Sequence, residues 1–156
     1  MRSPREPPTG AIRPYDAPDV EELIDAWYEA SLVAHSFLPA EFFVAERDLL
    51  RTEWLPVAET YVFEQDGRVV GFIALVGDEV GGIFVRPDHQ GEGIGSALMD
   101  HAVALRETLE LDVFEENAIG RRFYDGYGYG FEFISVSHEP TTGRVQHRLR
   151  LAVTPD

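Results

Sequence analysis

Apolar residues recur along this chain with two different spacings. Between residues 20 and 32, and again between 40 and 55, they return every three or four positions, which predicts two amphipathic helices. Pro56 ends the second pattern, because proline has no N–H to continue a helix. Elsewhere, short apolar runs or alternating apolar and polar residues predict strands. The predicted strands cover residues 12–15, 61–65, 68–75, 80–85, 109–113, 131–138 and 144–151.

A glycine-rich turn connects the predicted strand 80–85 to a further amphipathic helix. Gly91, Gly93 and Gly95 stand at alternate positions, so the backbone can turn its N–H groups inward without interference from a Cβ atom. The free N–H groups at the start of the helix add a partial positive charge. We call residues 90–96 the glycine turn, and we expect a phosphate-bearing ligand there. The plainer interpretation is a strand-to-helix turn without a ligand.

Known phosphate-binding motifs differ in the residues that accompany their glycines. The dinucleotide-binding fingerprint needs a third glycine where this chain has Ser96 or, in the other register, Leu98. The nucleoside-triphosphate loop needs a lysine, and this chain contains none. What remains is the motif Gln90-x-x-Gly93-x-Gly95.

This motif, between a strand and a helix, resembles the coenzyme A pyrophosphate loop of the GNAT N-acetyltransferase superfamily. A second segment adds to the resemblance, because Asn117 and Tyr124 have the separation of the superfamily's Asn-x(6)-Tyr helix. Two positions depart from the pattern: Gly120 replaces the usual alanine, and Gly128-Tyr129 replaces a Gly-Phe pair. Neither departure removes a reactive group. Without the glycine turn, Tyr124 would be interpreted as a core aromatic.

The resemblance implies a fold. The predicted elements follow the order of an α/β fold of the GNAT type, with a mixed central sheet that is splayed at the cofactor site and flanked by helices. Residues 11–152 would form a single domain, after a disordered lead over residues 1–10 that is rich in proline and charge. The coenzyme would lie in the split of the sheet. By resemblance it would contact Phe84, Val85, Gln90, Gly91, Glu92, Gly93, Ile94, Gly95, Ser96, Asn117, Phe123 and Tyr124.

The reaction implied is direct transfer of an acetyl group from acetyl-coenzyme A to an amine of a small molecule or peptide, with coenzyme A as product. Tyr124 would serve the leaving thiolate, and a backbone N–H near Phe84 or Val85 the developing oxyanion. Two residues are candidates for the base. Glu79 lies near the start of the splayed strand, and His35 titrates near neutrality and lies in a Trp-x(3)-Ser-x(3)-His pattern of some small bacterial members. Glu79 ranks narrowly first, although a turn carboxylate and a helix-end histidine remain the structural alternatives.

The composition limits the partners, the reaction chemistry and the location that we expect. The chain has 28 acidic against 13 basic residues and a net charge of −15, which disfavours nucleic acids and anionic membranes as partners. It has no cysteine, so a protein thiol nucleophile is excluded, and its histidines show no metal-ligand spacing, so we expect no metal. There is no long apolar run or signal peptide, and a cytoplasmic location is expected. A homodimer stays open.

Two other functions fit part of this pattern. A non-catalytic sensor or interaction module that binds acyl-coenzyme A would keep the glycine turn, but the retained Asn117 and Tyr124 argue against it. An enzyme of another class would use the turn for a different phosphorylated ligand, such as a nucleotide, but it lacks the lysine and third glycine of those motifs. The acceptor itself is not identified by any motif; polyamines, small amines, an antibiotic and a protein N-terminus all have suitable chemistry.

Overall fold

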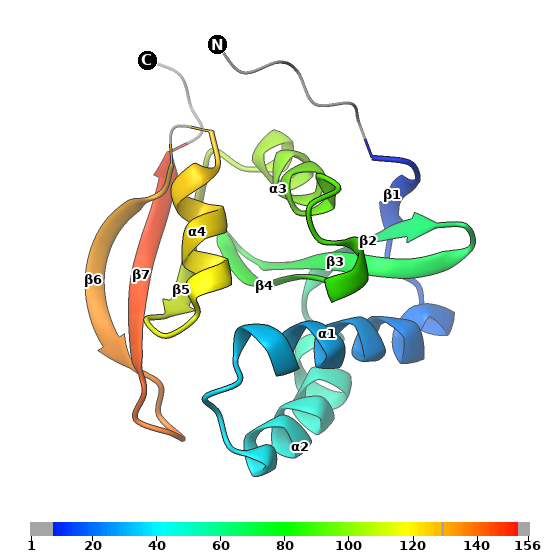
Figure 1. Cartoon of the computed structure of the whole chain (residues 1–156). Coiled ribbons are helices and arrows are strands. Elements are labelled where there is room, and N and C mark those ends of the chain that lie inside the picture. Colours follow the sequence, from blue (N-terminus) through cyan, green and yellow to red (C-terminus); the bar gives the residue numbers. More distant parts are fainter. Residues whose placement is uncertain (1–7, 129, 153–156) are drawn as a thin grey trace.

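A mixed β-sheet forms the centre of the protein (Figure 1). The structure is a computed structural model that describes residues 8–128 and 130–152, and within them the sheet has the strand order β1-β2-β3-β4-β5-β7-β6. Neighbouring strands are antiparallel except for β4 and β5, which are parallel. The strands are β1 (Ala11–Pro14), β2 (Glu59–Gln65), β3 (Arg68–Val76), β4 (Glu79–Val85), β5 (Thr108–Phe114), β6 (Glu132–His138) and β7 (Val145–Ala152).

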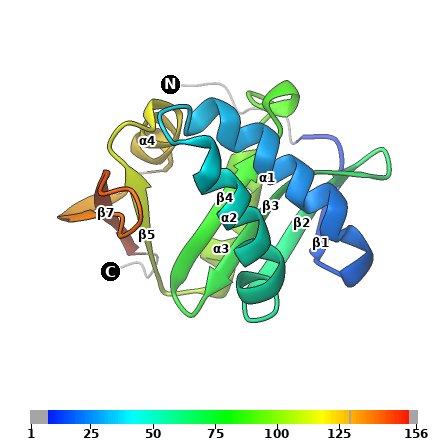
Figure 2. The same ribbon diagram turned by 90° about the horizontal axis from the view of Figure 1, so that it is seen from below.

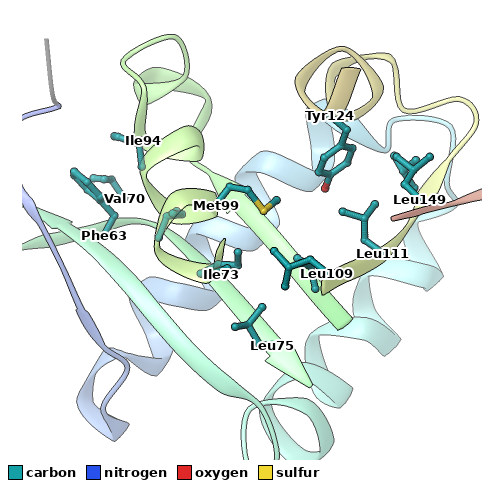
Figure 3. Packing of buried hydrophobic residues seen from close by; sticks show 14 residues of the cluster. Phe63, Val70, Ile73, Leu75, Ile94, Met99, Leu109, Leu111, Tyr124 and Leu149 are labelled. Atoms are coloured by element: carbon teal, nitrogen blue, oxygen red, sulfur yellow. The ribbon is translucent and has the colours of Figure 1, made fainter. Parts of the chain in front are cut away.

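Helices cover both faces of the sheet. The helices α1 (Val20–Ala34) and α2 (Ala40–Leu49) lie on one face, and α3 (Ile94–Leu105) and α4 (Ala118–Gly126) lie on the other (Figures 1 and 2). Each face has its own buried apolar cluster, because successive strand residues point to opposite sides. Figure 3 shows the cluster under α3 and α4, where Tyr124 lies beside Leu111 and Leu149. Within the described residues, no helix is long and apolar enough to cross a membrane.

The sheet is split between β4 and β5. Within the described residues these strands pair only at Glu79 and Glu110, next to a hydrogen bond of 2.9 Å from the Glu110 N–H to the Asp78 carbonyl. The register between β3 and β4 shifts between Val80 and Gly82, which leaves Gly81 as a bulge that bends β4. Beyond this bulge, β4 pairs with no strand on the β5 side in the part of the chain that the structure describes. The predicted splay of a mixed sheet is therefore confirmed.

The predicted elements are found with small changes at their ends. The Asp66-Gly67 turn has positive φ at both residues, 52° and 75°, as a tight hairpin requires. The second predicted helix is regular only to Leu49 and continues as a π-helical turn, Leu50–Trp54. There the Thr52 hydroxyl donates to the Asp48 carbonyl at 2.9 Å. In a regular helix this carbonyl would instead accept from the Thr52 N–H. Most of the predicted lead (residues 1–7), and Tyr129, lie outside the described residues.

Candidate active site

The glycine turn forms a concave backbone at the start of α3. Gly91 and Gly93 have φ values of 86° and 90°, a region that residues with a Cβ atom rarely adopt. Gly93 caps α3, and its carbonyl accepts from the Ala97 N–H at 3.0 Å. The N–H groups of the following turn have no acceptor further back in the helix, so they can face an anion. The Glu92 carboxylate lies 3.4 Å from His89 Nδ1 and 3.4 Å from Gln65 Nε2.

A cavity of about 460 Å³ extends from the glycine turn to α4. We call it the turn cavity; its wall includes Gln90, Ser96 and Phe123. A Cβ atom on Gly95 would lie 3.2 Å from the Phe123 ring, so a glycine at this position lets α3 and α4 approach closely. The cavity wall also carries the exposed side chain of Arg122, a cation beside the anion-binding backbone.

The open edge of β4 forms one side of the turn cavity. The Arg86 N–H donates to the Val70 carbonyl at 2.8 Å and Phe84 pairs with Phe72, so the backbone groups of Phe84 bond to β3. By the alternation of an antiparallel ladder, the amide groups of Ile83 and Val85 face the split. The Val85 carbonyl accepts there from Gln90 Nε2 at 3.0 Å. The open backbone expected at Phe84 is therefore wrong, because its backbone groups bond to β3 and only its ring can face the split. The contact of Val85 with the coenzyme stays a prediction.

A second cavity of about 460 Å³ lies on the other side of the split. We call it the aromatic cavity, because α1 contributes Trp27 with Ser31 and His35, and α2 contributes Phe42 and Phe43. The two cavities meet, since four residues line both of them. These shared residues are Ile83, Phe84, Asn117 and Tyr124. A ligand in the turn cavity and a ligand in the aromatic cavity would therefore touch at this junction.

Asn117 is fixed at the junction by two contacts. Its Oδ1 accepts from the Gly120 N–H at 2.8 Å as the cap of α4, and its Nδ2 lies 3.2 Å from His35 Nε2. The cap sets the orientation of the amide, so Nδ2 donates and the imidazole Nε2 accepts. A Cβ atom on Gly120 would lie 2.5 Å from Asn117 Nδ2, so an alanine at this position would require the Asn117 side chain to shift.

Comparison with known proteins identifies the family. The family model described as acetyltransferase (GNAT) domain matches residues 56–130. The peptidyl-lysine N-acetyltransferase YjaB of Escherichia coli is 34% identical over 110 residues, which cover 70% of this chain and 74% of YjaB. The chain belongs to the GNAT acetyltransferase family. It is an N-acetyltransferase that uses acetyl-coenzyme A to acetylate an amine, as the resemblance implied.

Two further comparisons agree with this assignment. The peptidyl-lysine N-acetyltransferase YiaC of Escherichia coli is 29% identical over 119 residues, which cover 76% of this chain and 82% of YiaC. The solution structure of the apo form of Escherichia coli YjaB superposes with a TM-score of 0.80 at 29% identity and covers 90% of this chain and 95% of that one. The similarity to this solved structure thus covers most of the GNAT fold.

The residues around the turn cavity fit acetyl-coenzyme A. The glycine turn offers backbone N–H groups to a pyrophosphate, and Arg122 adds a cation within reach of a phosphate. The amide groups of Ile83 and Val85 can pair with the amides of the pantetheine arm, in the way an added strand would. A thioester at the end of that arm would lie at the junction, beside Tyr124.

Tyr124 keeps its proton at the junction. Its side chain is buried, and burial raises the pKa of the phenol above its ordinary value. In Figure 3 the hydroxyl points away from α4. A tyrosine in this state donates a hydrogen bond and does not act as a base, which suits a group that meets a leaving thiolate.

Glu79 lies in the aromatic cavity and is held by an arginine. Its carboxylate is 2.9 Å from Nη2 of Arg148 on β7, and the same guanidinium lies 3.2 Å from Glu110 and 3.3 Å from Asp112. Asp112 also lines the aromatic cavity. The cavity thus contains a second carboxylate on the same arginine as Glu79. Sequence spacing gave no signal for Asp112 or Arg148, because the contact joins three strands that are far apart in the chain.

His35 lies in the aromatic cavity as a neutral imidazole. Burial lowers the pKa of His35 to about 4. Its imidazole ring contacts the rings of Phe37, Phe84 and Phe114. Because its Nε2 already accepts from Asn117, His35 has no lone pair left for a substrate proton in this arrangement.

This lowered pKa makes stability depend on pH in a defined direction. Between pH 6.5 and about 4 the unfolded chain protonates His35 while the folded one does not, so stability falls as pH falls through this window. In His35→Asn this loss is absent. We therefore expect the wild-type protein to lose about 2 kcal/mol more unfolding free energy than His35→Asn does when the pH is lowered from about 7 to about 5. Urea unfolding at both pH values measures it; a constant difference would contradict the neutral imidazole.

Proposed function

We propose that the acceptor is the side-chain amine of a peptide lysine, which enters through the aromatic cavity. The observation that carries this proposal is the meeting of two unlike cavities at the junction: a backbone-lined cavity suited to a phosphate and an aromatic, acidic one. Aromatic walls suit an aliphatic stem, and carboxylates such as Glu79 and Asp112 attract an ammonium group. The names of YjaB and YiaC, both peptidyl-lysine N-acetyltransferases, support the same acceptor.

Each proposed role follows from the position of the group. The Ile83 or Val85 N–H, facing the split, would donate to the carbonyl oxygen as it gains negative charge. Tyr124 would donate its hydroxyl hydrogen bond to the thiolate that leaves. The amine must lose a proton before or during attack, and Glu79 would accept it, directly or through water. His35 would orient Asn117 and would not serve as base.

The role of Glu79 predicts a particular pH profile. Glu79→Gln should lower kcat/KM on a lysine peptide by about 100-fold near neutral pH, the usual scale for loss of a general base. The deficit should shrink as pH rises, because an increasing share of the amine is then unprotonated in solution. Steady-state rates across the pH range, followed as free thiol, measure both effects.

Two variants serve as comparisons for Glu79→Gln. Asp112→Asn removes the other carboxylate that shares Arg148 and lines the aromatic cavity, and it should leave the shape of the profile unchanged. His35→Asn should also keep that shape, because His35 does not carry the proton. If either of these variants reproduces the low-pH deficit while Glu79→Gln is silent, the base is that residue.

A further inference from the structure

Glu46 is a carboxylate in the aromatic cavity that lacks a cation. It lies on α2 and is half-buried. Among the described residues its side chain forms no hydrogen bond or ion pair. Burial raises the pKa of Glu46, and repulsion from the nearby Glu139 raises it further, to a smaller extent. Partial removal of a carboxylate from water without a partner is unfavourable, and a positively charged group of a ligand would offset this cost.

A second carboxylate faces the same cavity from the opposite element. Glu139 lies in the turn between β6 and β7 and also lines the aromatic cavity. Its oxygens accept from the Thr141 N–H at 3.0 Å, the Thr142 N–H at 2.6 Å and the Thr142 hydroxyl at 2.7 Å. Burial acts to raise the pKa of Glu139, but these hydrogen bonds outweigh it and the net shift is downward. Glu139 is thus a fixed, ionised neighbour of Glu46.

The cations nearest in the chain are engaged elsewhere. The Arg47 guanidinium lies over the Tyr28 ring at 4.8 Å from its centre. Arg144 pairs with Glu116 at 3.0 Å and donates to the Phe37 carbonyl at 3.2 Å. Neither arginine lines the aromatic cavity within the described residues. The negative charge of Glu46 and Glu139 is therefore left for something that enters.

An independent observation also points to a polar ligand in this cavity. The Ser31 hydroxyl is buried, with 1% of the residue exposed, and has no hydrogen-bond partner among the described residues. Ser31 lines the aromatic cavity between Trp27 and His35 on the same face of α1. Buried hydroxyl groups in folded proteins nearly always have a partner, so an incoming polar group is the expected one.

We propose that the acceptor carries a second positive charge beside the amine that is acetylated, and that Glu46 and Glu139 bind this second charge. The inference rests on the proposed acetylation of a peptide lysine and narrows it to lysines with a basic neighbour. Two carboxylates from α2 and from the β6–β7 turn suit an ammonium or guanidinium group between them. A free polyamine has the same chemistry, and the experiment separates the two sources.

The experiment compares matched acceptors in the thiol-release assay. One pair is acetyl-Ala-Lys-Ala-amide and acetyl-Ala-Lys-Arg-amide; the other is butylamine and spermidine. For the wild-type protein we expect the arginine-containing peptide to have a KM about tenfold lower than the neutral peptide, as one partly exposed charge pair provides. Glu46→Gln should abolish most of that difference, through a higher KM on the arginine-containing peptide.

The control is Glu41→Gln, which removes an exposed acid from the same helix outside the cavity and should preserve the tenfold difference. Equal KM values within both pairs for the wild-type protein would overturn the inference, as would equal losses on both peptides in Glu46→Gln. A preference confined to spermidine would support the second-charge site and contradict the peptide acceptor. Thiol release with none of the four amines would overturn the proposed acetylation itself, and the inference with it.

Discussion

Gly93→Val should weaken acetyl-coenzyme A binding by about 100-fold or more, which corresponds to about 2.7 kcal/mol. Gly93 has a φ of 90° and caps α3 beside the N–H groups that face the anion. A valine there must either adopt a strained backbone or turn the N–H groups out of position, and its side chain would stand where the pyrophosphate approaches. Calorimetric titration with acetyl-coenzyme A measures the change.

Backbone strain alone is tested by a valine at a comparable glycine. Gly77, between β3 and β4, has a φ of 60°, and an added Cβ atom there would have nothing within 4 Å. Gly77→Val should lower thermal stability as Gly93→Val does but leave the dissociation constant unchanged. Equal affinities of Gly93→Val and the wild-type protein would remove the glycine turn from the binding site.

Tyr124→Phe should lower kcat by about 100-fold while acetyl-coenzyme A binding stays the same. The substitution removes only the hydroxyl of Tyr124, a residue that lines both cavities, so the packing against Phe123 and Phe131 remains. The loss follows from the missing hydrogen bond to the leaving thiolate, for which the raised pKa of the phenol keeps the proton available. Steady-state kinetics with calorimetric binding separates the two quantities.

Tyr127→Phe is the matched control. Tyr127 follows α4, lines neither cavity, and donates its hydroxyl hydrogen bond to Asp100 at 2.5 Å. Its loss should affect stability and leave kcat nearly unchanged. If Tyr124→Phe turns over as fast as the wild-type protein at every pH, Tyr124 serves packing only.

The geometry of the candidate site that could be predicted from the sequence is the part built from local backbone. The glycine turn is one continuous segment, and Asn117 caps the helix on which Tyr124 lies, so motif spacing defines their geometry. The splay of the sheet followed from the family resemblance. The open backbone at Ile83 instead of Phe84 depends on the register with β3, which a sequence pattern without pairing information does not fix.

The remaining features arise from tertiary contacts. Arg148 brings Glu79 and Asp112 together from three strands, and the hydrogen bond from Asn117 to His35 joins residues 82 positions apart. That bond changes the interpretation of His35, because it occupies the lone pair a base would need. Glu46 belonged to an amphipathic pattern that predicted a helix but not which acidic residue would face a cavity.

The most direct test of the central claim is to measure both products of one reaction. Wild-type protein is incubated with acetyl-coenzyme A and acetyl-Ala-Lys-Arg-amide, and free thiol and acetylated peptide are quantified from the same samples. Direct transfer predicts that the two increase in equal amounts and that neither increases without enzyme. Binding of acetyl-coenzyme A with no thiol release for any amine would contradict catalysis and favour a sensor of acyl-coenzyme A, and thiol release without acetylated peptide would contradict the lysine acceptor.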